Sequence, residues 1–292
     1  EDENILSELD LFPSINLIYG LKEMSNLRFS LSRTIARPSF KEKSIAQIFD
    51  PVTSTTFIGN IDILPTKILN YDLRWELFQE DAQMYAISLF YKDFTNPIEL
   101  VVYNGASPND YTPKNVDEAI VYGLEVELRK NLKFLSENLS NFNLTFNTSI
   151  IRSEEIMDEK EYEGRIKSAR SGEVVSRKRE LQGQSPYLVN LGLNYNSINN
   201  NFEGSLNYNV QGKTLQIVGV NYVPDIFTEP FNSLNLNFNY KFGRTGNLKL
   251  GLGIKNLLDE KVESYYYTND IKSIYSSLSP RREFKLSLGI NF

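Results

Sequence analysis

The sequence predicts an all-β protein, a transmembrane antiparallel β-barrel, and three observations lead to this fold class. The composition is typical of strands, since 17 Tyr and 18 Phe occur in 292 residues and aromatic side chains are enriched in β-structure. Segments in which apolar and polar residues alternate recur along the whole chain. The connections between these segments are short and long in turn, which is typical of barrels that cross an outer membrane.

Each alternating segment predicts one strand. In residues 284–292, the clearest case, every even position is apolar and every odd position is polar or glycine. Because successive side chains of a strand point to opposite faces, such a segment has one apolar and one polar face. The eleven segments of this kind lie near residues 15–21, 27–35, 69–77, 85–91, 122–128, 142–146, 187–195, 202–215, 234–242, 248–254 and 284–292.

The lengths of the connections favour a membrane barrel over other β-folds. The short connections are residues 22–26, 80–83, 133–140, 199–201 and 243–247, and the long ones are residues 36–63, 101–115, 153–186, 216–230 and 259–282. Outer-membrane barrels have short periplasmic turns and long extracellular loops. A soluble sandwich or solenoid is the alternative, but a sandwich would have turns of mixed length on both rims, and its inner faces would rarely be charged.

The alternation also predicts which side chains meet lipid. In residues 248–254 the even positions are aliphatic, whereas the odd ones are Lys249 and two glycines. A lysine that faces mid-membrane lipid costs roughly 2–4 kcal/mol, so the even positions should face the bilayer. The residues expected to face lipid are Leu236, Phe238, Leu250, Leu252, Leu286 and Leu288. The residues expected to face the lumen are Asp72, Arg74, Glu76, Glu125, Glu127, Arg129, Asn235 and Asn237.

Composition excludes several function classes. The chain has no Cys and no His, which removes thiolate metal sites, disulfides and the usual general base of hydrolases. A net charge of −6 argues against nucleic acid as a partner, because that would require a basic face. Paired carboxylates are abundant, yet their period-two spacing on strand faces fits a polar channel lining. We therefore expect neither an enzyme nor a resident cofactor or metal site.

Two features of the long connections are candidates for a ligand site. Residues 153–186 carry an acidic run followed by a basic run, which suits either an ion or anionic-ligand site or two solvated arms that pair with each other. Aromatic residues in two neighbouring connections could stack a sugar or a planar siderophore, or could pack on one another. These aromatic candidates are Tyr222, Phe227, Tyr265, Tyr266 and Tyr267.

The odd number of predicted strands has a topological consequence. A closed single-chain bacterial barrel has an even number of strands. Eleven strands whose last one runs toward the periplasm cannot close alone in the usual topology. We therefore expect residues 1–292 to form the C-terminal part of a larger barrel.

The sequence resembles the C-terminal half of a TonB-dependent outer-membrane receptor, most closely those of Bacteroidetes. The resembling stretches are residues 33–40 (RTIARPSF), 59–60 (GN), 64–65 (LP), 71–76 (YDLRWE), 90–94 (FYKDF), 97–99 (PIE), 122–127 (YGLEVE), 184–187 (QSPY), 255–260 (KNLLDE) and the terminal Phe292. The resemblance implies a 22-stranded barrel in the bacterial outer membrane, with a plug and the earlier strands outside this chain. It also implies energy coupling through TonB–ExbB–ExbD.

Further implications concern assembly and substrate. Phe292, the last residue of an alternating strand, looks like the signal read by the barrel-assembly machinery. A surface lipoprotein lid would be a further partner of a glycan or peptide importer. The resemblance implies import of a scarce nutrient, whether a siderophore, cobalamin, a glycan or a peptide. The alternative is a receptor-like barrel that serves as a structural subunit of a larger outer-membrane complex.

Overall fold

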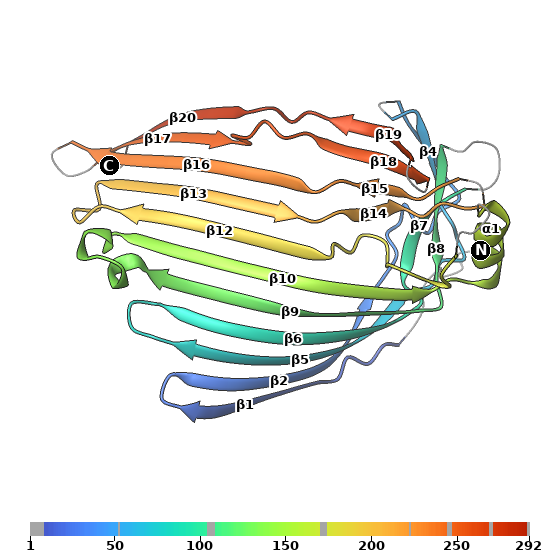
Figure 1. The fold of residues 1–292 in the computed structure, drawn as a ribbon, viewed down its shortest axis with the longest axis horizontal. Helices are drawn as coiled ribbons and strands as arrows, with labels where there is room; N and C mark the ends of the chain where they lie inside the picture. The colour runs from blue at the N-terminus through green and yellow to red at the C-terminus, as the bar shows by residue number, and fades with distance from the viewer. Residues whose placement is uncertain are drawn as a thin grey trace.

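Long antiparallel strands form one curved sheet in the computed structural model, which describes residues 9–51, 53–103, 109–169, 174–221, 223–243, 247–268 and 271–290. Within these residues the sheet order follows the chain order (Figure 1). The strands along this path are β1 (Ser14–Lys22), β2 (Ser25–Ala36), β5 (Thr66–Phe78), β6 (Met84–Thr95), β9 (Glu118–Asn131), β10 (Phe142–Ile156), β12 (Tyr187–Asn196), β13 (Phe202–Gln211), β16 (Phe231–Phe242), β17 (Leu248–Lys255) and β20 (Glu283–Ile290). The eleven predicted strands are confirmed.

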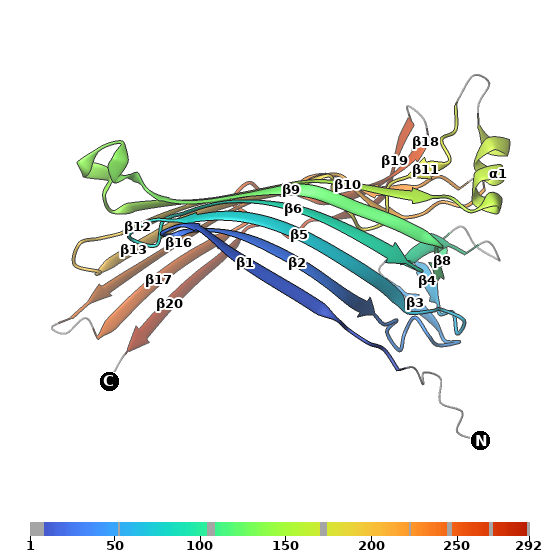
Figure 2. The same ribbon diagram turned by 90° about the horizontal axis from the view of Figure 1, so that it is seen from below.

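The sheet is an open arc. Among the described strands, β1 pairs only with β2, and β20 pairs only with β17. Figure 2 shows the arc in profile, with the first and last strands at its two free sides. All pairings along the path are antiparallel, so the expectation of a partial antiparallel barrel is confirmed.

Most strands differ by a few residues at their ends from the sequence prediction, and two differences have a clear structural reason. The predicted strand 202–215 is split, because β13 ends at Gln211 and β14 (Thr214–Ile217) begins after a break at Gly212. A Cβ at Gly212 would lie 2.8 Å from the ring of Tyr187, so this close approach requires glycine. The predicted strand 142–146 is too short, since β10 continues to Ile156 through pairing with β9 as far as Glu155 and Ala119.

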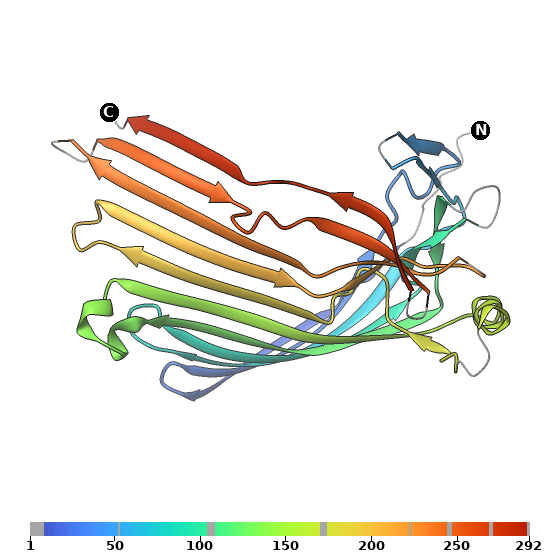
Figure 3. The same ribbon diagram turned by 45° about the horizontal axis from the view of Figure 1, so that its top comes forward.

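The short connections lie at one end of the long strands and the long connections at the other (Figure 3). The short connection after β9 contains two 3-10 turns, η1 (Leu132–Phe134) and η2 (Glu137–Leu139). The two rims expected from the sequence are therefore present. We call the end that carries the long connections the loop rim, and the other end the turn rim.

The loop rim is folded rather than irregular. One small sheet has the order β3-β4-β8-β7 and another the order β14-β15-β18-β19. Their further strands are β3 (Gln47–Asp50), β4 (Thr55–Ile58), β7 (Ile98–Val102), β8 (Asp110–Asn115), β15 (Ile226–Thr228), β18 (Val262–Thr268) and β19 (Ile271–Leu278). A two-residue strand, β11 (Lys178–Arg179), pairs with β10, and the helix α1 (Glu159–Ser168) lies beside it. None of the described helices is long and apolar enough to cross a membrane.

Two of the three clusters of buried apolar residues in the described part of the chain lie where these two small sheets meet. Val101 and Val102 of β7 contact Leu215, Ile217 and Val218, all of which are buried. The Val102 N–H donates to the Val218 carbonyl oxygen at 2.9 Å. The two small sheets therefore form one packed layer across the loop rim.

The strand register places the predicted face residues consistently. Leu236 and Phe238 are on the same face as Leu250 and Leu252, because Phe238 pairs with Leu252 and Tyr240 with Leu250. Leu286 and Leu288 join this face through their pairing with Leu252 and Leu250. The eight predicted lumen residues are on the opposite face, linked row by row from β5 to β17. That these faces meet lipid and lumen stays a prediction. Phe292 lies outside the described residues.

Candidate functional site

Glu99 and Glu155, the two most deeply buried acidic residues of the described chain, belong to a cluster under the loop rim. Arg179 of β11 is 6% exposed in its side chain and contacts three carboxylates. Its Nη2 lies 2.6 Å from an oxygen of Glu99 and 2.7 Å from one of Glu155, and its Nε lies 2.8 Å from an oxygen of Glu161. These four residues, called here the arginine clasp, join β7, β10, α1 and β11.

The clasp has more negative than positive groups. Arg165 adds a second guanidinium, which lies 3.0 Å from Glu161 and 2.8 Å from Asp225, so two cations face four carboxyl groups. Burial, and then the nearby charge of Glu99, raises the pKa of Glu155 to about 9. Its Oε2 is buried without a hydrogen-bond partner among the described residues. The raised pKa therefore favours the protonated form of Glu155 at neutral pH.

This titration belongs to the loop rim and not to the membrane-crossing part of β10. A tilted strand crosses a bilayer with about 9–11 residues. Glu155 is the fourteenth of the 15 residues of β10, and its partners Glu99, Glu161 and Arg179 all come from the long connections. It lies beyond the crossing segment.

Helix α1 is attached to the rim through polar contacts. The Asp158 side chain caps the helix by accepting from the Glu161 N–H at 2.8 Å, and it also pairs with Lys114 of β8. The Ser168 hydroxyl donates to the Asn221 carbonyl oxygen at 3.0 Å. The only buried residues of the helix are Glu161 and Gly164. Since an isolated helix of ten residues is unstable in water, these contacts hold it in place.

The acidic and basic runs of residues 153–186 thus do two things. Lys178 pairs with Glu154 at 2.7 Å and Arg177 pairs with Glu159 at 2.8 Å in exposed positions, which is the solvated pairing considered from the sequence. Arg179, by contrast, is buried. Sequence reasoning missed its partner Glu99, because that residue lies 80 positions away along the chain.

Three of the predicted aromatic residues meet two lysines and a glutamate above β13. We call this group the lysine–aromatic cluster, and it consists of Lys213, Phe227, Glu229, Tyr265, Tyr267 and Lys272. The Lys213 Nζ lies 3.3 Å from the ring centre of Tyr267 and 4.1 Å from that of Phe227.

The second lysine completes the cluster. The Lys272 Nζ lies 4.0 Å from the ring centre of Tyr265 and 3.0 Å from the Glu229 carboxylate. The Tyr267 hydroxyl donates to the same carboxylate. Burial lowers the pKa of Lys213, while the charges of Glu229 and Glu180 oppose that shift. The ammonium groups of the two lysines thus already lie over the rings of Phe227, Tyr265 and Tyr267.

The other two aromatic candidates are separate. Tyr266 packs edge-on against Tyr275, with ring centres 5.3 Å apart, and belongs to the core between the small sheets. It points away from Tyr265 and Tyr267 because neighbouring residues of β18 face opposite sides. Tyr222 lies outside the described residues.

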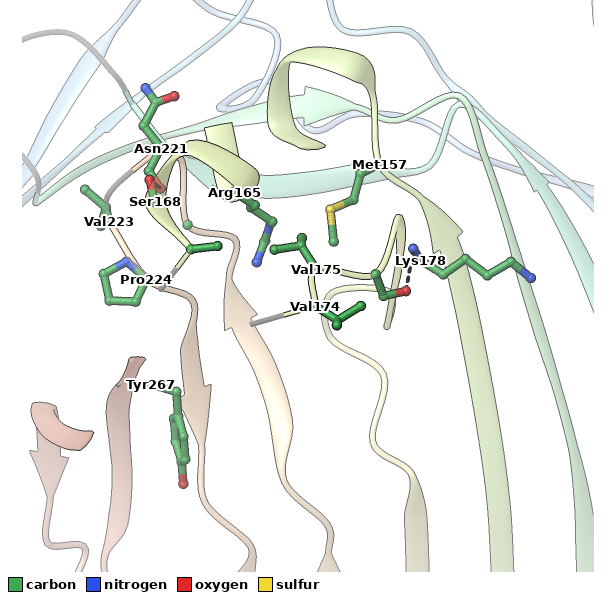
Figure 4. Close-up of a pocket in the computed structure, with 13 residues that line it drawn as sticks. Met157, Arg165, Ser168, Val174, Val175, Lys178, Asn221, Val223, Pro224 and Tyr267 are labelled. Carbon is green, nitrogen blue, oxygen red and sulfur yellow. Dashed lines mark hydrogen bonds between the residues drawn. The ribbon is translucent and has the colours of Figure 1, made fainter. Parts of the chain in front are cut away.

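Two cavities open beside these groups. The first has about 320 Å³ and lies between α1 and the connection after β14, with Arg165, Ser168 and Lys178 in its wall. Arg165, Met157 and Val175 are among the residues that line this cavity in Figure 4. The second has about 430 Å³ and borders the lysine–aromatic cluster, because Glu229 lines it. Its polar side chains are Gln182, Gln211, Gln216, Thr214, Thr228 and Glu229.

The predicted lumen residues form a chain of ion pairs across the sheet. Arg74 lies 3.2 Å from Glu76 and 3.0 Å from Glu127, and Glu127 lies 2.9 Å from Arg129. Arg28 of β2, which sequence reasoning missed, pairs with Glu76. The signal for it was present in the sequence, because Arg28 lies between Leu27 and Phe29 at a polar position of the alternating segment 27–35.

The remaining predicted lumen residues are on the same face with milder contacts. Glu125 accepts from the Ser149 hydroxyl at 3.4 Å. Asn235 accepts from the Asn256 N–H at 3.0 Å. Asp72 and Asn237 are placed on this face by the register. Across the described part of the chain, no group of three or more acidic side chains is arranged to hold a metal ion.

Comparison with known proteins identifies relatives of this architecture. A family model described as "TonB dependent receptor-like, beta-barrel" matches residues 3–257. No curated protein matches the chain. A mutant of the ferric enterobactin receptor PfeA from Pseudomonas aeruginosa is similar, with a TM-score of 0.60, 19% identity, and coverage of 96% of this chain and 40% of the receptor.

Two further solved structures show the same fold. The unliganded ferric citrate transporter FecA has a TM-score of 0.63 and 17% identity, over 95% of this chain and 38% of FecA. The siderophore receptor PirA from Acinetobacter baumannii has a TM-score of 0.59 and 16% identity, over 96% of this chain and 41% of PirA. The chain thus spans about 40% of the length of these proteins.

Proposed function

The chain belongs to the TonB-dependent receptor β-barrel family of the outer membrane, and we propose that it forms part of a receptor that imports a scarce nutrient. The observation that carries this proposal is the loop rim. Five long connections fold there into a layer with two cavities, above a sheet whose predicted lumen face is polar. A transporter needs both a place to capture its ligand and a wetted wall beneath it.

The ligand would meet the loop rim first. The lysine–aromatic cluster and the cavity beside it offer ammonium, phenol, amide and hydroxyl groups within a small area. Siderophores, cobalamin, glycans and peptides all offer groups that such donors and acceptors bind. The similar structures include receptors for ferric enterobactin and ferric citrate, which makes a ferric siderophore the first ligand to try.

The rest of the receptor would supply the remaining parts of the transporter. In this proposal, residues 1–292 are the C-terminal part of the barrel, and the free sides at β1 and β20 pair with the earlier strands of the same protein. A plug and the TonB–ExbB–ExbD system supply gating and energy. Phe292 is the signal for the barrel-assembly machinery, and a surface lipoprotein is a candidate lid. Leu250 and its face meet lipid.

The test is uptake by the intact receptor in cells with and without TonB. We expect the double substitution Lys213→Met and Lys272→Met to raise the concentration of ferric siderophore needed for half-maximal uptake by at least about tenfold. Such a change corresponds to a loss of about 1.4 kcal/mol of binding free energy. Lys261→Met is the matched control, because this exposed lysine lies outside the cluster.

Uptake that persists without TonB would contradict the proposal. Deletion of the receptor gene could also leave nutrient uptake intact while a larger outer-membrane complex disappears. That result would support the alternative, a structural subunit.

A further inference from the structure

An apolar cavity lies on the predicted lipid face near the turn rim. It has about 480 Å³ and is formed by β10, β12, β13 and β16, which lie side by side in Figure 1. The lining residues, called here the aromatic crevice, are Phe142, Leu193, Tyr195, Phe202, Gly204, Ser205, Leu206, Leu236 and Phe238. None of them is charged.

Rings surround a glycine in the wall of this cavity. One row of register partners runs Phe142, Tyr195, Gly204 and Phe238 across the four strands. A Cβ at Gly204 would lie 3.2 Å from the ring of Phe238, so that ring leans over the glycine. The row therefore has rings on both sides of a position that carries none.

The rings around the gap contact one another. The ring centres of Phe142 and Tyr195 are 4.8 Å apart, and those of Tyr195 and Phe202 are 5.8 Å apart. Phe202 stacks on Phe238 at 5.7 Å. Aromatic contacts of this kind are favourable beyond the area they bury, so the walls are mutually braced and the cavity is a built feature of this face.

Position and chemistry indicate what fills it. Gly204 is the third residue of β13, which places it about 7 Å along the strand from the turn rim at about 3.3 Å per residue. The cavity therefore begins near the headgroup level and extends into the hydrocarbon. The opposite face of the same strands carries Asn143, Asn194 and Asn237, so water and polar solutes belong on the other side.

We propose that the aromatic crevice binds one acyl chain of a glycerophospholipid from the leaflet at the turn rim. This inference rests on the proposed membrane placement. Between apolar surfaces in a bilayer, packing rather than the hydrophobic effect decides association. A braced, ring-walled cavity offers an acyl chain more contacts than a surface without such a cavity does.

The experiment fills the cavity and counts restricted lipid. The intact receptor is reconstituted in phosphatidylethanolamine vesicles that contain a trace of acyl-chain spin-labelled phosphatidylethanolamine. Leu206→Trp adds bulk within the crevice, and Leu286→Trp makes the same change on the same face two strands beyond it. Gly204→Leu disrupts the crevice in a second way, because its side chain must displace the Phe238 ring.

We expect Leu206→Trp and Gly204→Leu to lower the motionally restricted lipid per receptor by about one molecule, while Leu286→Trp leaves it unchanged. Equal restricted lipid in the wild type and all three variants overturns the proposal. Displacement of the label by lipopolysaccharide as readily as by phosphatidylethanolamine overturns the assigned lipid source.

A nitroxide at position 286 separates this failure from failure of the proposed function. Relaxation by oxygen places the face in the bilayer even if the crevice holds no lipid. Relaxation by a water-soluble agent overturns the membrane placement itself.

Discussion

Replacing Arg179 by Met should release the arginine clasp while keeping much of the side-chain volume. The substitution leaves Glu99 and Glu155 buried without their shared cation, whereas Glu161 keeps its pairing with Arg165. Breaking a buried ion pair by removing one partner costs about 3–5 kcal/mol. Glu155 adds little to this cost, because its raised pKa of about 9 keeps it neutral at pH 7.

The size of the effect should depend on pH. A carboxylate that loses its counterion can escape the cost by taking up a proton. For an ordinary glutamate with a pKa near 4.3, this requires about 4 kcal/mol at pH 7 but only about 1 kcal/mol at pH 5, at 1.36 kcal/mol per unit. The variant should therefore be strongly destabilised at the loop rim at neutral pH and much less so at pH 5.

Hydrogen exchange of the intact receptor measures this opening locally. We expect amides of α1 to exchange about 100- to 1,000-fold faster in Arg179→Met at pH 7 after correction for the intrinsic rate, since each tenfold step corresponds to 1.36 kcal/mol. Lys178→Met is the matched control, because the neighbouring Lys178–Glu154 pair is exposed and such pairs contribute about 0–1 kcal/mol. Equal protection of α1 in both variants would refute the reasoning.

Other predictions concern pH, face and assembly. The pKa of Glu155 is raised to about 9, so between about pH 4.3 and pH 9 the folded clasp holds a proton that the unfolded chain has released. The stability of the rim should therefore fall by about 1.4 kcal/mol for each pH unit in this range. Glu155→Gln should remove this pH dependence of the hydrogen-exchange protection. Leu250→Arg should cost roughly 2–4 kcal/mol and lower the barrel yield, as a charge in lipid does. Gly251→Arg should crowd Ser287, whose Oγ would lie 2.5 Å from the new Cβ, and should leave more assembled barrel in a heat-modifiability gel. Phe292→Asp should reduce outer-membrane levels while barrels that have assembled keep their wild-type melting temperature.

The strands could be predicted because the membrane imposes a simple rule on them. Apolar and polar residues must alternate along a strand between lipid and lumen. Residues 284–290 and 248–254 show this alternation, and they form the paired strands β20 and β17. Strand residues that lie beyond the membrane need not alternate in this way. β10 continues beyond its alternating part into residues such as Glu154 and Glu155, whose burial depends on tertiary partners.

The loop rim shows why the rest could not be predicted. Glu99 and Arg179 are 80 residues apart and meet only because β7 and β11 are placed over the same end of the sheet. Tyr265, Tyr266 and Tyr267 are adjacent in sequence but divide between the lysine–aromatic cluster and the core. The aromatic composition of this segment was visible, whereas the face of each ring depended on the pairing of β18 with β15.

The rim combines two kinds of attachment that respond to different conditions. The small sheets are joined through buried aliphatic contacts of Val101, Val102, Leu215, Ile217 and Val218, and those contacts are insensitive to charge. Helix α1 buries only a glutamate and a glycine, and it is held by ion pairs and a helix cap. Because local opening follows the weakest set of contacts, we expect α1 to leave the rim before the two small sheets separate. Arg165 and Ser168 line the cavity beside α1, so we expect such an opening to widen that cavity.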